Sequence, residues 1–207
     1  MITLFWCPQT RASRALWLLE ELGRPFEVRL IDIRDPEAKK DPDFQAASPM
    51  GKVPAIMDTT LGGTVYLADS APIALYLADR YTGSGLAPPI DDPKRAPFLY
   101  WMNYTPGVIE PAMMERFLGI EVPRASSGWG DFDFMIEVLE NGVRGHTWLL
   151  GEQFSAADVL VGSSVHFMQK FGILPQSKVL EAYLQRCLAR PAYQKALARE
   201  DELTDQP

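Results

Sequence analysis

The segment Lys52-Val53-Pro54-Ala55-Ile56-Met57 decides how the first part of the chain folds, because it combines a strand-forming run with a proline near its start. Proline has no N–H to give to a sheet ladder, so Pro54 belongs at the margin of a sheet. A second strand-forming run, Thr64-Val65-Tyr66-Leu67, follows after the turn Leu61-Gly62-Gly63. Two such runs joined by a glycine turn predict an antiparallel hairpin.

The residues before and after this hairpin complete an α/β domain. The run Ile2–Trp6 is short and apolar, which is typical of a buried strand, and apolar residues spaced three and four apart predict a helix over 11–23. Residues 26–33 alternate apolar and charged side chains and predict a half-exposed strand, while Asp69-Ser70 is the expected start of a helix. The order βαβ followed by ββα predicts a thioredoxin-like domain, with a mixed four-stranded sheet and helices on its faces.

A change of composition divides the chain. A Gly-, Ser- and Pro-rich segment over 83–91 is typical of a linker, and every periodic segment beyond it is helical. The best-formed helix start contains Ser155 and Asp158 at the three-residue spacing of a capping box. We therefore expect a thioredoxin-like domain over residues 1–82, the linker over 83–91 and an all-helical C-terminal domain over 92–207.

The charge and hydropathy of the chain disfavour nucleic-acid and membrane partners. The 207 residues include 20 Lys and Arg against 27 Asp and Glu, a net charge of −7, whereas nucleic-acid binding depends on clustered cations. No apolar run approaches the ~18 residues that span a bilayer. We therefore expect no nucleic acid and no membrane among the partners, and a small molecule or a protein instead.

Cysteine and histidine usage indicates a reducing compartment and no metal. Cys7 and Cys187 are too few for the disulfide framework of an extracellular protein, and the N-terminal residues lack a signal-peptide pattern. A cytoplasmic location is therefore expected. His146 and His166 do not have the spacing of metal ligands, so no metal site is expected.

Two places around the predicted sheet could bind a peptide. A cis bond before Pro54 would turn the N–H and C=O of Val53 outward to pair with an extended peptide backbone, the alternative being an ordinary trans loop proline. Asp69-Ser70 opens a helix, where free N–H groups favour a carboxylate, and Asp69 could hold an ammonium. Together they match the amino-acid end of a γ-glutamyl group, although plain N-capping is the simpler interpretation of this pair.

The turn Trp6-Cys7-Pro8-Gln9-Thr10-Arg11 leads from a strand into a helix N-terminus, a place that stabilises an anion. Thr10 offers a hydroxyl donor, Cys7 could itself be the reactive thiol, and Ser13 is a third candidate that we expect to face the sheet. Structural roles, a buried Cys and a capping Thr, are the alternative. A dithiol redox centre is excluded because no second Cys stands at C-x-x-C spacing.

An aromatic and Met-rich stretch follows the linker. Its members are Tyr100, Tyr104, Met113, Met114 and Phe117. A stripe at helical spacing is usually core, but soft, adaptable methionines also suit the wall of an apolar pocket.

Five segments carry a family resemblance: Arg14–Gly23, Ser48–Ile56, Leu67–Ile73, Trp148–Val159 and Arg190–Tyr193. In this order they resemble the cytosolic glutathione S-transferase superfamily over essentially the whole chain. The resemblance implies an N-terminal thioredoxin-like domain, an all-helical C-terminal domain and a homodimer. It also implies an enzyme that uses glutathione as co-substrate, without a metal, and transfers an alkyl or aryl group from a small hydrophobic electrophile to the glutathione sulfur.

The resemblance also assigns roles by position. Val53 would pair with the cysteinyl part of glutathione, Pro54 would be a cis proline, and Lys52 would lie near a glutathione carboxylate. Asp69 and Ser70 would hold the γ-glutamyl end. The electrophile pocket would be lined by Tyr104, Met113, Met114 and Phe117.

The activating residue departs from the tyrosine-using classes, which place a Tyr where this chain has Leu4-Phe5-Trp6. Thr10 matches the serine of the serine-using classes, and Cys7-Pro8 matches the Cys-Pro of the cysteine-using classes. Thr10 would hydrogen-bond the glutathione thiolate for attack on an electrophilic carbon. Cys7 would form a mixed disulfide and act as a thiol transferase or reductase.

We favour Thr10 and conjugation. A non-catalytic, transferase-like binding module is the alternative from a different class of protein. An isomerase, dehalogenase or ether-cleaving enzyme would use the same glutathione site with another apolar pocket.

Overall fold

The computed structural model describes residues 1–204, and these form two compact units. Unit 1 comprises residues 1–84 together with the segment that begins at Arg190, and unit 2 comprises residues 85–189. Within residues 1–204, every helix is too short or too polar to cross a bilayer.

Unit 1 is built on a mixed four-stranded sheet with the order β2-β1-β3-β4. Strand β1 pairs in parallel with β2 and antiparallel with β3, which pairs antiparallel with β4. The strands are β1 (Ile2–Trp6), β2 (Phe26–Leu30), β3 (Ala55–Asp58) and β4 (Val65–Ala68). The predicted thioredoxin-like arrangement is confirmed, with β3 starting directly after Pro54 because proline cannot donate to the ladder.

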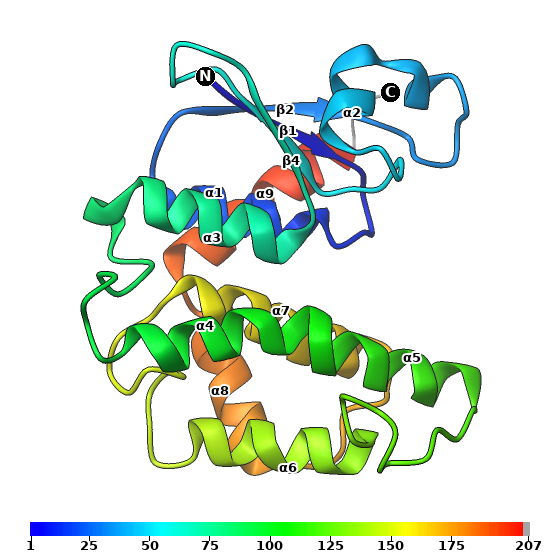
Figure 1. The fold of residues 1–207 in the computed structure, drawn as a ribbon, viewed down its shortest axis with the longest axis vertical. Coiled ribbons are helices and arrows are strands. Elements are labelled where there is room, and N and C mark those ends of the chain that lie inside the picture. Colours follow the sequence, from blue (N-terminus) through cyan, green and yellow to red (C-terminus); the bar gives the residue numbers. More distant parts are fainter. Residues whose placement is uncertain (205–207) are drawn as a thin grey trace. The chain divides into compact units, whose positions relative to one another are not determined.

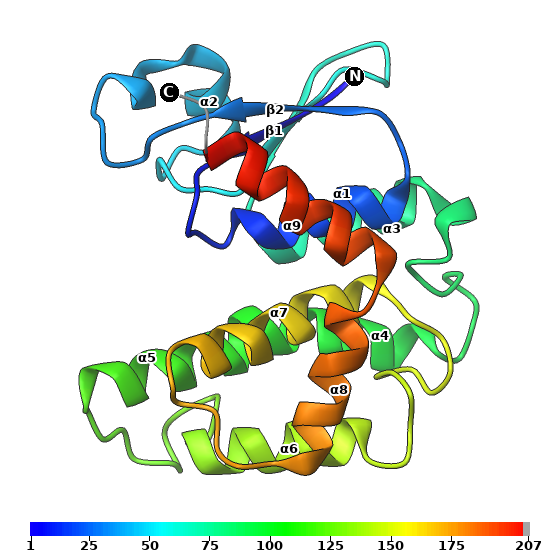
Figure 2. The same ribbon diagram turned by 180° about the vertical axis from the view of Figure 1, so that it is seen from behind.

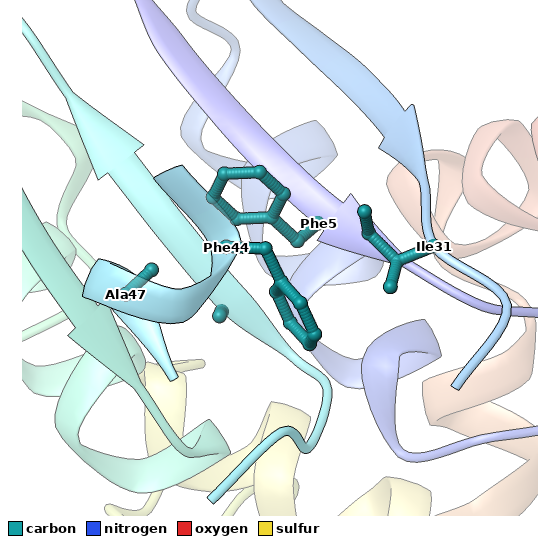
Figure 3. Close-up of a cluster of buried hydrophobic side chains, with 5 residues drawn as sticks. Phe5, Ile31, Phe44 and Ala47 are labelled. Atoms are coloured by element: carbon teal, nitrogen blue, oxygen red, sulfur yellow. The ribbon is translucent and has the colours of Figure 1, made fainter. Parts of the chain in front are cut away.

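Helices cover the two faces of this sheet. Helices α1 (Ala12–Leu22) and α3 (Ser70–Arg80) pack against each other on one side of it (Figure 1). The short helix α2 (Pro42–Ala47), which follows the single turn η1 (Ala38–Lys40), lies on the other side. There Phe44 packs on Phe5 with ring centroids 5.6 Å apart (Figure 3). Successive side chains of a strand point to opposite faces, so β1 contributes to the cores on both sides of the sheet.

The last helix, α9 (Pro191–Thr204), belongs to unit 1 and lies along α1 (Figure 2). Arg190 directs its guanidinium to the carboxylate of Glu21, with Nη2 2.7 Å from Oε2. The ring of Tyr193 meets Trp17 edge-on at 5.2 Å. Residues 92–207 were expected to form one helical domain. The described residues in this range are mainly helical, but α9 packs on α1 in unit 1 because of contacts between residues far apart in sequence.

Unit 2 is all-helical, as predicted. Its α-helices are α4 (Arg95–Tyr104), α5 (Glu110–Leu118), α6 (Phe132–Val143), α7 (Ala156–Lys170) and α8 (Lys178–Leu188). A π-helical turn, η3 (Thr105–Ile109), lies between α4 and α5. Pro106 and Gly107 lie in η3, where proline removes a backbone donor and interrupts the regular ladder. The predicted capping box at the start of α7 is present, with the Ser155 N–H donating to Asp158 at 2.9 Å. Most of α7 is buried, so it forms the centre of this unit.

Candidate functional site

The strand registers of unit 1 bring three segments to one edge of the sheet. Phe5 pairs with Ala55, and Ala55 pairs with Ala68. The turn after β1, the segment before β3 and the residues after β4 therefore lie at the same edge. These segments contain Cys7 and Thr10, Val53 and Pro54, and Asp69 and Ser70.

The peptide bond between Val53 and Pro54 is cis, as expected. The Pro54 C=O accepts a hydrogen bond from the N–H of Asp69 at 3.1 Å, which ties the segment before β3 to the start of α3. Val53 lies outside both ladders of β3, so the sheet does not use its backbone N–H and C=O. These groups can therefore pair with an extended peptide laid along this edge.

A buried serine that the sequence analysis did not single out holds the backbone just before Val53. The Ser48 hydroxyl donates to the Lys52 C=O at 2.7 Å and accepts from the Lys52 N–H at 2.9 Å. Ser48 lies in the Ser48–Ile56 segment, but sequence spacing gives no sign that one side chain makes both bonds. Its role is to fix the loop that presents Val53.

Two lysines flank this loop. Lys52 is exposed, and the half-buried Lys39 from η1 runs over Gly51, where an added Cβ would lie 3.6 Å from Lys39 Cδ. Neither ammonium forms an ion pair with any carboxylate of residues 1–204. Lys39 was missed because it stands in an irregular stretch twelve residues before Gly51. Together the two lysines make this end of the edge positive.

Asp69 and Ser70 begin α3 in a way that differs from plain capping. Asp69 occupies the N-cap position with a left-handed backbone, φ 72°, yet its carboxylate accepts no capping hydrogen bond. It is exposed, and Ser70 beside it is half-buried. The carboxylate can hold an ammonium, while the first-turn N–H groups of α3 remain suited to a carboxylate. The structure therefore contradicts the capping interpretation for Asp69, and ligand binding stays a prediction for this pair.

The turn between β1 and α1 contains two candidate residues, Cys7 and Thr10, which differ in solvent exposure. Cys7 is 2% exposed, whereas Thr10 is half-buried. The Thr10 hydroxyl donates to the Cys7 C=O at 2.7 Å and accepts from the Ala12 N–H at 3.2 Å. Both structural alternatives are therefore visible, a buried cysteine and a threonine bonded to the first turn of α1. Of the two residues, Thr10 is the more exposed.

Ser13 supports the same turn. Its hydroxyl donates to the Thr10 C=O at 3.1 Å, and its N–H points to the same oxygen at 3.4 Å. Gln9, just before Thr10, is exposed and has a left-handed backbone with φ 58°.

The four pocket candidates of unit 2 fall into two groups. Tyr104 and Met113 are buried, and the Tyr104 hydroxyl donates to the Met135 C=O at 3.4 Å. Burial raises the pKa of Tyr104, with a smaller effect from Tyr100. Met114 and Phe117 are nearly half exposed. The first pair therefore belongs to the core of unit 2 and the second to its surface.

Comparisons with known proteins identify the family of the chain. The family model of the glutathione S-transferase N-terminal domain matches residues 6–80, and that of the C-terminal domain matches residues 132–191. Glutathione S-transferase GstA of Escherichia coli O157:H7 is 23% identical, with 95% of this chain and 98% of that protein covered.

Two solved structures are similar over almost the whole length. A glutathione transferase from Methylococcus capsulatus strain Bath has a TM-score of 0.79 and 28% identity, covering 98% of this chain and 100% of its own. A sphingomonad glutathione S-transferase complexed with glutathione has a TM-score of 0.75 and 27% identity, covering 96% and 98%. The second of these proteins binds glutathione with the fold that unit 1 and unit 2 share with it.

Proposed function

The chain belongs to the glutathione S-transferase superfamily, and from that premise we propose how it binds glutathione and activates the thiol. It transfers an alkyl or aryl group from a small apolar electrophile to the glutathione sulfur. The observation that carries the proposal is the meeting of Val53-Pro54, Asp69-Ser70 and the Thr10 turn at one edge of the sheet.

Each part of the tripeptide has a matching group at this edge. The cysteinyl backbone pairs with the N–H and C=O of Val53, which the sheet ladders do not use. The α-ammonium of the γ-glutamyl end meets the uncapped carboxylate of Asp69, and the α-carboxylate meets Ser70 and the first turn of α3. The glycyl carboxylate lies near Lys52 and Lys39.

Thr10 is the activating residue in this proposal. Its hydroxyl donates a hydrogen bond to the thiolate, which lowers the pKa of the bound glutathione thiol as the proton leaves to solvent. The thiolate sulfur then attacks the electrophilic carbon, a sulfur–carbon bond forms, and the leaving group departs with the bonding pair. The exposure of Thr10 and the burial of Cys7 favour conjugation over a mixed disulfide at Cys7.

For the electrophile pocket we propose contacts from Met114 and Phe117, the two exposed members of the predicted set. Tyr104 and Met113 support them from the core. We also propose a homodimer, since Met50, 82% exposed, and the half-exposed Tyr100 are apolar surface of the kind that subunits cover. Cys7 and Cys187 are free thiols, which fits a reducing cytoplasm.

The test compares Thr10→Val with Cys7→Ala. Thr10→Val keeps the shape and removes the hydroxyl, so turnover of a chloronitroaromatic electrophile should fall about ten- to a hundredfold, the value of one charge-assisted hydrogen bond. Cys7→Ala keeps the backbone carbonyl and should retain turnover. If Thr10→Val stays active while Cys7→Ala abolishes deglutathionylation of a mixed disulfide, Cys7 is the catalytic residue instead.

A further inference from the structure

The heavy atoms of Thr10 are held from both sides by the turn itself. The Ala12 N–H binds the side-chain oxygen, and Ser13 donates through its hydroxyl and its N–H to the Thr10 carbonyl. A threonine is also stiff about its first side-chain bond, because its β-carbon is branched. The Thr10 oxygen therefore has a fixed place at the site.

The hydroxyl proton is the part of Thr10 that remains able to move. It points to the Cys7 C=O at 2.7 Å, so it is not directed at a ligand. Rotation about the C–O bond would redirect it to a thiolate while the oxygen keeps its bond from the Ala12 N–H, since a hydroxyl accepts through two lone pairs. A hydrogen bond to an ionised sulfur is about twice as strong as one to a neutral carbonyl, so the exchange is favourable.

We propose that Gln9 and Ser13 are positioning residues that lock Thr10, so that capture of the thiolate needs only the rotation of one hydroxyl proton from the Cys7 carbonyl to the sulfur. The inference rests on the proposed function of Thr10. A hydrogen-bond donor that is already in place stabilises a developing charge without any movement of heavy atoms, and this is a general way in which enzymes lower the free energy of a charged state. No covalent bond of the protein forms or breaks in this step.

Gln9 acts through its backbone. A non-glycine residue with φ 58° is uncommon and tends to persist where the surroundings require it, often at functional sites. The Gln9 side chain is exposed, so core packing does not explain the conformation. A left-handed residue at this point reverses the chain between Cys7 and Thr10 and brings the Cys7 carbonyl within reach of the hydroxyl.

The two positions allow matched variants. Ser13→Ala removes the hydroxyl donor to the Thr10 carbonyl, and Ser13→Thr restores it, because a threonine hydroxyl in a helix can bond a carbonyl three residues back. Gln9→Val opposes the left-handed backbone, since β-branched residues avoid it, and Gln9→Gly permits it. Each pair changes one property at one position.

The readout is the pKa of the glutathione thiol in the complex with the enzyme, followed by thiolate absorbance as the pH is raised. Ser13→Ala and Gln9→Val should raise this pKa by about half a unit, the effect of weakening one hydrogen bond. Ser13→Thr and Gln9→Gly should keep the wild-type pKa. Calorimetric binding of S-methylglutathione, which has no thiol, should be the same in all four variants, and this also checks that each has folded.

The inference is overturned if the tripeptide analogue binds normally while the thiol pKa in Ser13→Ala and Gln9→Val equals that of the wild type. It is also overturned if the alanine and threonine variants at position 13 raise the pKa equally. A wild-type protein that does not bind S-methylglutathione overturns the proposed function itself. These results are distinct, because the first two require an intact tripeptide site.

Discussion

Asp58 in unit 1 and Asp158 in unit 2 are both 0% exposed, yet the pKa values of their carboxyls shift in opposite directions. Burial would raise the pKa of Asp58, but hydrogen bonds from Thr60, then Tyr76, and the charge of Arg80 outweigh it and lower the pKa. The Arg80 Nε lies 3.4 Å from the carboxylate. A buried charge with a cation beside it therefore stays ionised.

Asp158 has only dipolar partners. It accepts from the N–H groups of Leu149 at 3.0 Å and Ser155 at 2.9 Å, and from the Tyr183 hydroxyl at 3.1 Å. Burial is the largest influence and raises the pKa of Asp158 to about 6 despite these bonds. The difference teaches that hydrogen bonds can place a buried carboxylate accurately without making its charge favourable.

Of the variants that test this comparison, Asp58→Asn should have the largest effect on the free energy of unfolding. The change removes the charge opposite Arg80 and weakens the hydrogen bonds from Thr60 and Tyr76, so it should lower the free energy of unfolding by about 2–3 kcal/mol at neutral pH. Asp158→Asn removes no ion pair, keeps an oxygen for the cap and takes away a charge that burial disfavours at neutral pH, so it should cost no more than about 1 kcal/mol there. Urea unfolding of both variants measures the two values, and equal losses would contradict the distinction. Asp58 lies at the end of β3 opposite the candidate site, so S-methylglutathione binding serves as the control for a folded Asp58→Asn protein.

The pH dependence of stability sharpens the comparison. The folded pKa of Asp158 is raised, so its protonated form stabilises the protein below about pH 4, and this contribution is lost as the pH rises through about 6. The loss should be about 3 kcal/mol and absent from Asp158→Asn. For Asp58 the folded pKa is lowered, so stability is present above the unfolded pKa and lost as the pH falls through the folded value.

Urea unfolding of the wild type and both asparagine variants between pH 3 and 8 separates these contributions. Subtracting the Asp158→Asn curve should leave a difference that changes between about pH 4 and 6. If instead that difference changes only below pH 4, the pKa of Asp158 is not raised.

The smallest effects come from the tyrosines that bond each carboxylate. Tyr76→Phe removes the hydrogen bond at 2.9 Å to Asp58, and Tyr183→Phe removes the one at 3.1 Å to the Asp158 carboxylate together with a longer one, at 3.5 Å, to the Asp158 C=O. Each change should cost about 1 kcal/mol of unfolding free energy. Both variants should also raise the pKa of the partner aspartate. Carboxyl carbon NMR titration follows each aspartate directly, and an unchanged titration in either variant would show that the bond has no electrostatic effect.

The same two aspartates indicate what a sequence can predict. The capping box of Asp158 can be predicted from the sequence, because Ser155 stands three residues away. The hydrogen bond between Asp158 and Tyr183 cannot be predicted in this way, because it spans 25 residues. Asp58 has one local partner, Thr60, two residues away, but its partners Tyr76 and Arg80 follow from the packing of α3 on the sheet, which spacing does not reveal. Local patterns predicted the sequence of strands and helices and the start of α3, since each depends on neighbouring residues, whereas the cis bond before Pro54 was expected from the thioredoxin-like arrangement rather than from its spacing.

The candidate site follows the same rule. Val53, Pro54, Asp69 and Ser70 come together because of strand pairing, which the hairpin pattern already predicts. Lys39 lies beside Gly51, near these residues, but its own segment has no periodic pattern. The sequence therefore did not predict Lys39 as part of the site. Helical spacing grouped Met113 with Met114, but neighbouring positions on a helix face different surroundings, and only the structure separates the buried from the exposed one.

The hydrogen bond between Glu21 and Arg190 spans 169 residues. The two ends of unit 1 are therefore far apart in the sequence, and this separation affects the order in which the two units can fold during synthesis. During synthesis, every residue of unit 2 is made before the helix that completes unit 1. Unit 1, which is synthesised first, is therefore completed last. Until α9 has been synthesised, the surface of α1 that α9 covers is exposed. A fragment ending at Ser84 would lack α9, so residues 1–84 alone do not make up the whole of unit 1.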